Sequence, residues 1–312
     1  MSNSQTHPRR SAQADPERGP GQKDRPGPIA PRGRLVLIIL ALVVVAVVAF
    51  LVLRGGQPTE SDQAGAQLEH VHGLGVDPAD DTLYAGTHYG LFRLPEQADG
   101  TRVADRVQDF MGFTVVGPNH FLASGHPGEG QDGPSSLGLI ESTDGGRTWE
   151  SLSLSGEADF HALKARHGLV YGFNSLTSTF MVSQDKRTWD ERGQLPMADF
   201  AVSPKSPDVV LATTERGLVR SDDGGRSFQL VRNAPVLLLV SWADDGAIAG
   251  VAPDGTVYAS GGEATSWDRR GTLENPPEAL AVANRDEVFA AAGGAVLASS
   301  DGGRTFTVRY SD

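Results

Sequence analysis

Histidine and aspartate side chains gather between residues 70 and 161 of this 312-residue chain, beside the ends of short apolar segments. Imidazole nitrogens bind transition metals and exchange protons near neutral pH, and paired carboxylates can act as acid and base. These residue types therefore indicate metal binding or proton transfer in this part of the chain. The histidines are His70, His72, His88, His126 and His161, and the aspartates are Asp109 and Asp159.

Three of the apolar segments align residue by residue. They read HVHGL from residue 70, DFMGF from residue 109 and DFHAL from residue 159. If the three segments have the same structure, equivalent side chains lie at the same level. His70, Asp109 and Asp159 then share one level, and His72, Met111 and His161 share the next.

Three interpretations of these residues stay open. In the first, His72, His161 and the thioether of Met111 bind copper or zinc. In the second, Asp109 and Asp159 are the acid and base of a glycoside hydrolase, with Glu157 or Asp199 as further carboxylates. In the third, the polar groups are hydrated around a water-filled channel. The side chains available to a ligand are His70, His72, His88, Met111, His126 and His161.

Composition excludes several other functions. The chain has no cysteine, so disulfides, thiolate catalysis and cysteine metal sites are absent. Residues 1 to 54 hold 8 Lys and Arg and 3 Asp and Glu, which leaves 19 basic and 36 acidic residues, a net charge of −17, after them. Such a surface repels nucleic acid. A P-loop, a G-x-G-x-x-G helix start, an H-E-x-x-H motif and a G-x-S-x-G motif are all missing.

The elements that position these side chains follow from an internal repeat. STDGGRTWE begins at Ser142, and related turns begin at Ser183, Ser221, Ser260 and Ser299, with spacings of 41, 38, 39 and 39 residues. So regular a period indicates one structural unit copied along the chain.

Each unit contains short segments rich in β-branched and aromatic residues, bounded by Gly, Pro, Asp or Asn. First strands are expected at 71–76, 110–115, 159–164, 199–204, 237–242 and 278–283. Second strands are expected at 82–87, 120–126, 168–174, 209–214, 247–253 and 287–292, and a third strand follows each of them. Six units of four strands predict an all-β protein, a six-bladed β-propeller.

The repeated turn falls between the third and fourth strands. Its glycines permit positive φ, its Asp can bond to backbone amides of the same turn, and its last aromatic residue can pack under the blade. The turn recurs in imperfect copies, which favours a structural role over a catalytic one. The residues assigned to this role are Asp144, Asp185, Asp223, Asp301, Trp149, Trp189, Phe228, Trp267 and Phe306.

The pattern S-x-D-G-G-x-T-W resembles the Asp-box (BNR) repeat of β-propellers, and its copies extend from Ser142 to Phe306. Sialidases, other glycosidases, sortilin-type receptors and photosystem assembly factors carry this repeat. The chain also looks like membrane-anchored bacterial propellers that begin H-x-H-G-L and are labelled glycosyl hydrolases. The resemblance implies the fold, but no sialidase catalytic residue can be transferred, because FRLP at residues 92 to 95 falls in a third strand.

Propeller topology divides the polar residues between two faces. First strands start, and second strands end, on the face opposite the repeated turns. The five histidines, Asp109 and Asp159 fall on this turn-free face of blades one to three. A Gly-rich insertion at residues 125 to 136 follows His126 and is expected to form a loop at the rim.

The sequence before the repeats predicts a membrane anchor. Residues 1 to 34 are rich in Pro, Gly, Ser and Arg and predict a disordered tail. Leu35 to Leu53 are nineteen uncharged residues, enough to span a bilayer as a helix and longer than the apolar part of most signal peptides. Basic residues before this segment predict a cytoplasmic N-terminus. Residues 54 to 68 are then a linker, and residues 69 to 312 are the propeller.

We therefore expect a single-pass membrane protein with its propeller outside the cytoplasm. The favoured function is ligand recognition in the central funnel, on the turn-free face of blades one to three. The expected ligand is a glycan or a metal ion, and no nucleic acid partner is expected. Glycoside hydrolysis in the same funnel is the first alternative. A scaffold that binds protein partners along its blade edges is the second.

Overall fold

The computed structural model describes residues 68–104, 108–128 and 130–311. The predicted tail and apolar segment, and all of the predicted linker except Leu68, lie outside the described residues. Within the described ranges, no helix has the length and apolarity needed to cross a membrane. These ranges form six antiparallel sheets of four strands each, and the chain passes through the sheets in order.

The predicted six-bladed, all-β propeller is confirmed. Expected and observed first and second strands agree within a few residues. The blades are, in order, β1 (Val71–Asp77), β2 (Thr82–Thr87), β3 (Gly90–Leu94), β4 (Thr101–Arg102); β5 (Asp109–Gly117), β6 (His120–His126), β7 (Leu139–Ser142), β8 (Glu150–Ser153); β9 (Phe160–Arg166), β10 (Leu169–Asn174), β11 (Thr179–Ser183), β12 (Asp190–Gln194); β13 (Phe200–Val202), β14 (Val210–Thr214), β15 (Gly217–Ser221), β16 (Gln229–Leu230); β17 (Leu239–Trp242), β18 (Ile248–Val251), β19 (Thr256–Ser260), β20 (Trp267–Thr272); and β21 (Pro277–Val282), β22 (Val288–Ala292), β23 (Ala295–Ser299), β24 (Thr307–Ser311).

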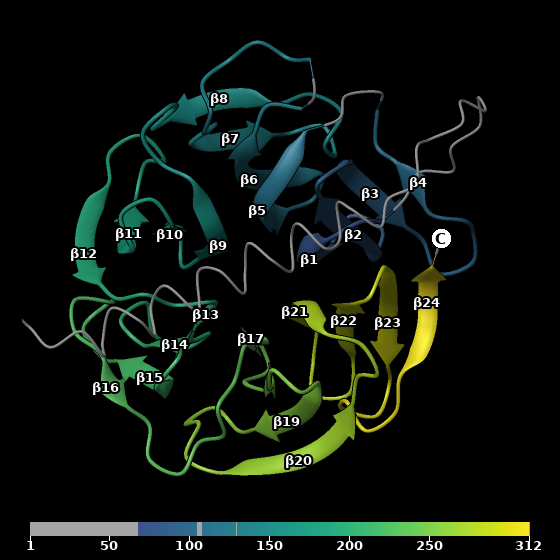
Figure 1. The fold of residues 1–312 in the computed structure, drawn as a ribbon, viewed down its shortest axis with the longest axis vertical. Helices are drawn as coiled ribbons and strands as arrows, with labels where there is room; N and C mark the ends of the chain where they lie inside the picture. Colours follow the sequence, from purple (N-terminus) through teal and green to yellow (C-terminus); the bar gives the residue numbers. More distant parts are fainter. Residues whose placement is uncertain (1–67, 105–107, 129, 312) are drawn as a thin grey trace, which may run out of the picture. The chain divides into compact units, whose positions relative to one another are not determined.

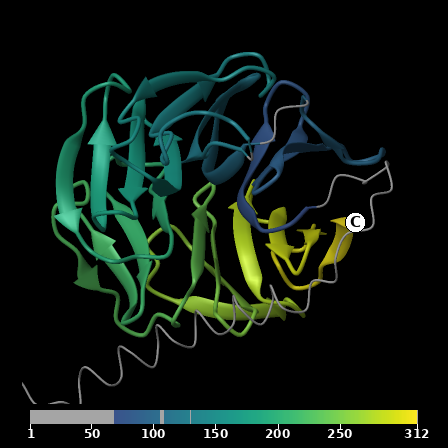
Figure 2. The ribbon, with the colours of Figure 1, turned by 45° about the horizontal axis from the view of Figure 1, so that its top comes forward.

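The six sheets are arranged radially, with the first strand of each blade near the centre and the fourth at the periphery (Figure 1). A view tilted by 45° shows neighbouring blades side by side around the central axis (Figure 2). The first strands therefore enclose the central channel. Side chains from different blades meet there even when they are far apart in sequence.

The hydrophobic core lies between blades. Each of the six clusters of buried apolar side chains combines residues from two adjacent blades. In the cluster that closes the ring, Leu68 and Phe92 of blade one pack with Phe289 and Val296 of blade six. Among the described residues blade six has four strands of its own, so the ring closes through this packing without an exchanged strand.

The repeated turn has the predicted hydrogen bonds. In blade two, both the amide and the hydroxyl of Thr148 donate to the Asp144 carboxylate, at 2.9 and 2.7 Å. In blade four, the Ser227 hydroxyl and amide donate to Asp223 in the same way and hold the pKa of that carboxyl well below its usual range. These carboxylates are therefore held within their own turns.

The aromatic residues that end the turns fix each turn to its blade. The Trp149 ring lies 5.1 Å from that of Phe110, and the Trp189 ring lies 4.7 Å from that of Phe160. Phe228 packs 6.0 Å from Phe180, across the boundary between blades three and four. Trp267 and Phe306 are half-buried against the cores on either side of blade five.

The second glycine of the turn sets how closely two blades approach. Gly225 has φ +89°, and a Cβ added to it would lie 2.2 Å from the Phe180 ring of the preceding blade. By contrast, Gly261 in the altered turn of blade five has open space where a Cβ would lie. The surroundings therefore require a glycine at position 225 but not at position 261.

Gly225→Ala should therefore lower the free energy of unfolding by about 2 to 4 kcal/mol, because it combines a strained backbone with a steric clash. Gly261→Ala is the matched control and should change stability by less than about 1 kcal/mol. Urea unfolding of both variants measures the difference. Equal stability of the two would contradict the proposed role of the second glycine.

Candidate functional site

β-Bulges interrupt the first strands of four blades near the turn-free face. In each case the register of the first strand shifts by one residue against the second strand. The extra residue is His72 in blade one, Met111 in blade two, His161 in blade three and Glu278 in blade six. Bulges change the direction of a side chain and interrupt the pairing locally. The predicted common level of His72, Met111 and His161 thus has a structural cause.

Two histidines and an aspartate form the most compact polar group on this face. His88 follows β2, and its Nδ1 lies 2.6 Å from Oδ1 of Asp109, the first residue of β5. His88 Nε2 lies 3.2 Å from His72 Nε2. Possible ligand atoms of the three residues all lie within 4.8 Å of one another, and within the described part of the chain no other group satisfies this criterion. All three side chains are partly buried.

The surroundings shift the pKa values of the two imidazoles in opposite directions. Burial, together with the charge of His88, lowers the pKa of His72 to about 4. The hydrogen bond to Asp109 raises the pKa of His88 above its usual value. When His88 is protonated, it donates Nδ1–H to Asp109 and Nε2–H to the neutral His72. One proton then lies between the two Nε2 atoms.

A second polar group joins blades two and three. The buried Asp159 accepts hydrogen bonds from His161 Nε2 at 2.8 Å and from the Ser175 hydroxyl at 3.0 Å. His126 Nε2 lies 3.8 Å from the same carboxylate, and its Nδ1 bonds to the Ser135 carbonyl in the insertion. Burial opposes ionisation of Asp159, but these hydrogen bonds outweigh it, so its pKa is lowered.

A cavity of about 150 Å³ joins the two groups at the central channel. His72 and His161 line it from one side, and Glu278 lines it from blade six. Lys164 also reaches this cavity, 3.8 Å from the buried Asp199. Burial raises the pKa of Asp199, although Lys164 opposes the shift.

The predicted site residues take different positions. His72, His88 and Asp109 form one group, whereas His126, Asp159 and His161 form another. The ring of His70 lies 5.3 Å from that of His88, at the exposed edge of the first group. Met111 occupies the equivalent bulge position in blade two. His161 is therefore not part of the compact group of His72, His88 and Asp109.

Sequence reasoning missed Glu278 and Ser175. Glu278 accepts hydrogen bonds from the amides of Val71 and Gly293, at 3.0 and 2.9 Å, and so links blade six to blade one. Glu278 could have been found from the sequence, because its position in the first strand of blade six is equivalent to that of His72 in blade one. Ser175 follows the second strand of blade three, just as His88 follows that of blade one.

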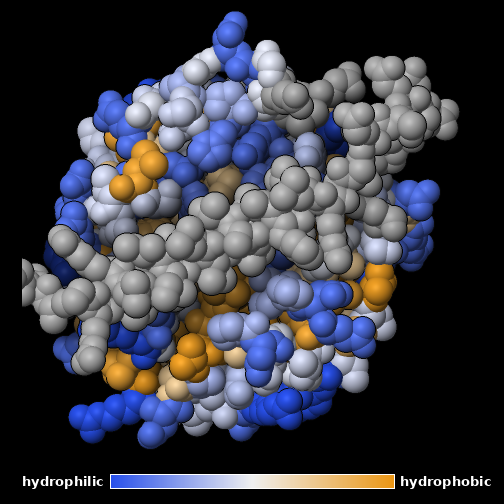
Figure 3. All heavy atoms as spheres, in the orientation of Figure 1, coloured by the Kyte–Doolittle hydropathy of each residue, from blue (hydrophilic) through white to orange (hydrophobic). Residues whose placement is uncertain are grey.

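The molecular surface in the view of Figure 3 is polar over much of the rim, with hydrophobic residues in separate patches. Exposed apolar side chains such as Leu176, Leu230 and Val308 belong to blades three, four and six, respectively. Isolated residues of this kind are normal on soluble surfaces. They do not define a docking face.

Comparisons with known proteins support the fold. No family model and no curated protein matches the sequence. Among solved structures, a gluconolactonase from Xanthomonas campestris is similar with a TM-score of 0.60 and 11% identity, over 74% of this chain and 86% of that one. YCF48 bound to D1 peptide has a TM-score of 0.51 and 17% identity, over 81% of this chain and 84% of that one.

The WD40 propeller domain of Doa1 is also similar, with a TM-score of 0.50 and 12% identity, over 78% of this chain and 83% of that domain. These neighbours differ in function but share the propeller architecture. At such low identity the similarity extends to the fold alone. This chain is therefore a β-propeller whose function has to be argued from its own residues.

Proposed function

We propose that this protein binds one divalent transition metal ion, zinc or copper, at the turn-free end of its propeller. The ligands are Nε2 of His72 and Nε2 of His88. The observation that carries the proposal is the close approach of these two nitrogens beside Asp109. Imidazole donors suit both metals.

The distance between the nitrogens fits a shared ion. Two imidazoles on a tetrahedral zinc ion, with Zn–N of about 2.0 to 2.1 Å, have their nitrogens roughly 3.3 Å apart. The observed separation is 3.2 Å. Both nitrogens lie on elements of one hairpin, β1 and the end of β2, so little rearrangement is required.

Asp109 positions one ligand. A carboxylate that accepts Nδ1–H from a metal-binding histidine fixes its tautomer and leaves Nε2 free for the ion. His88 and Asp109 have this arrangement. A metal ion at the two Nε2 atoms would replace the proton between them. The cavity beside His72 leaves room for water or a substrate group as a further ligand, and His161 lines the same cavity.

The cellular location of the site is also part of the proposal. We propose that the chain is an Asp-box propeller, because its turns contain the hydrogen bonds that their Ser, Asp and Thr residues require. We also propose that Leu35 to Leu53 anchor it in the membrane with the propeller outside the cytoplasm. The metal site would then be exposed to the extracytoplasmic medium.

Glycoside hydrolysis by Asp109 and Asp159 has weaker support. A general acid for this reaction needs a raised pKa so that it stays protonated near neutral pH. The pKa of Asp159 is lowered instead, and Asp109 is hydrogen-bonded to His88. Among the described residues, no surface specifically favours a scaffold function.

Metal analysis of the full-length protein, purified without chelators, tests the proposal. The wild type should carry close to one zinc or copper ion per chain, and His88→Ala and His72→Ala should each lose most of it. His120→Gln is the control, because His120 bonds to Glu141 away from this site. Equal metal content in all four proteins would contradict the assignment.

Metal affinity should depend on pH through His88. The metal competes with the Nε2 proton of His88, whose pKa lies above 6.5, whereas His72 stays neutral down to about pH 4. Affinity should therefore fall as the pH drops below the His88 pKa. Zinc titrations between pH 5 and 8, followed by calorimetry, measure this dependence.

Asp109→Asn separates positioning from ligation. Loss of a carboxylate that orients a metal-binding histidine typically weakens metal binding by about 10 to 100-fold. Without the Asp109 charge the His88 pKa also falls, so the loss of affinity should begin at a lower pH. An unshifted pH profile would show that Asp109 does not act through His88.

A further inference from the structure

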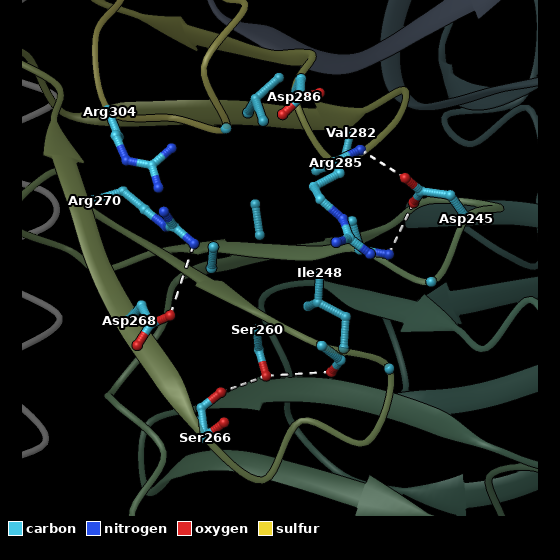
Figure 4. Close-up of a pocket in the computed structure, with 18 of the residues that line it drawn as sticks. Asp245, Ile248, Ser260, Ser266, Asp268, Arg270, Val282, Arg285, Asp286 and Arg304 are labelled. Atoms are coloured by element: carbon cyan, nitrogen blue, oxygen red, sulfur yellow. Dashed lines mark hydrogen bonds and ion pairs between the residues drawn. The ribbon is translucent and has the colours of Figure 1, made fainter.

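A second cavity lies away from the histidines, between blades five and six, and has a volume of about 490 Å³ (Figure 4). Its walls include the altered turn of blade five at residues 260–262, strand β20 and loops of blade six. Cavities of this size accommodate small-molecule ligands. Four cationic side chains line it: Lys205, Arg270, Arg285 and Arg304.

Arg270, on β20, has a buried hydrogen-bond donor without an acceptor among the described residues. Its Nε is buried, and within the described ranges no residue accepts a hydrogen bond from it. The nearest carboxylate oxygen, from Asp268, is 3.7 Å from Arg270 Nη2, which is too long for a hydrogen bond. Asp268 is itself largely exposed. A buried guanidinium nitrogen without an acceptor is destabilising unless a ligand supplies one.

In blade three, the equivalent arginine has hydrogen-bond acceptors within the protein. Blade three reads WDERG from residue 189, and blade five reads WDRRG from residue 267, so Arg192 is equivalent to Arg270. Arg192 Nε donates to Asp190 at 3.0 Å, and its Nη1 donates to the carbonyl of Gly224 in the next turn. Arg226 of that turn donates to Asp190 at 2.8 Å.

The corresponding bonds are missing from the described part of blade five. Arg304 is equivalent to Arg226, and each donates from Nη1 to the Asp carbonyl of its own turn. Only Arg226 also bonds to the aspartate of the preceding blade. Figure 4 shows the guanidinium groups of Arg270 and Arg304 on the same side of the cavity. Two cations that face one space without an anion between them repel each other.

Among the described residues, Asp268 forms only the long ion pair with Arg270, at 3.7 Å, and the other two acidic residues of the cavity lie apart from both arginines. Asp245 lies on the opposite side in Figure 4, where it accepts from the amides of Ala247 and Arg285 at 2.9 and 2.8 Å. Asp286 belongs to the blade-six loop above the cavity. Neither carboxylate lies within ion-pair distance of Arg270 or Arg304.

We propose that this cavity binds the oxyanion of a small ligand, a carboxylate or phosphate group, through Arg270 and Arg304. The planar fork of an arginine pairs with two oxygens of such a group. The ligand would supply the acceptors that Asp190 and Gly224 supply to Arg192 in blade three. Open space beside Gly261 leaves room for the rest of the ligand.

Thermal unfolding of the full-length protein tests the proposal with acetate, inorganic phosphate and chloride at equal ionic strength. A ligand that binds only the folded state raises its unfolding midpoint. Acetate or phosphate should raise the midpoint by several degrees more than chloride does. The larger effect identifies the preferred oxyanion, and a response to neither anion would overturn the proposal.

Two matched variants separate the site from general salt effects. Phosphate also stabilises proteins by exclusion from their surfaces, and Arg270→Gln should retain only this effect. Arg192→Gln should lower the midpoint, because it loses internal bonds, but keep the full anion response. An anion response in Arg270→Gln equal to that of the wild type would overturn the assignment.

Discussion

Packing between blades is the interaction on which the rest of this structure depends. A four-stranded sheet with two apolar faces cannot bury either face alone, and here each face packs against the neighbouring blade. The ring must therefore close, and contacts such as Leu68 with blade six complete it. The second glycine of the repeated turn serves the same packing, because only a residue without a side chain fits beside Phe180 at Gly225.

The closed ring also explains how a polar site arises at its centre. First strands converge on the axis, so one residue from each strand can face the same small volume. In blades one, two, three and six a bulge selects that residue. In these four blades the pairing of the first strand with the second is interrupted at this end. Histidines and a glutamate can thus point into the channel while the apolar residues beside them stay between the blades.

Differences between copies of the repeat are as informative as the repeat itself. Arg192 and Arg270 have nearly the same neighbours in sequence, but the first is satisfied within the protein and the second borders a cavity. The turn of blade five, which has Gly262 where other turns have Asp, lines that cavity. Comparison among blades thus separates residues that maintain the fold from residues left free for a ligand.

The sequence by itself determined the six blades, most strand positions and the structural role of Asp144 and Asp223, because these depend on a local period and on turns that are complete within a few residues. It also placed the histidines on one face, since strand direction alternates regularly. Only the tertiary structure decided that His88 and Asp109 join His72 while His161 does not, and that Glu278 lines the same channel. Asp109 and Glu278 come from other blades than His72, and all of these contacts depend on bulges and side-chain directions, which no local pattern encodes.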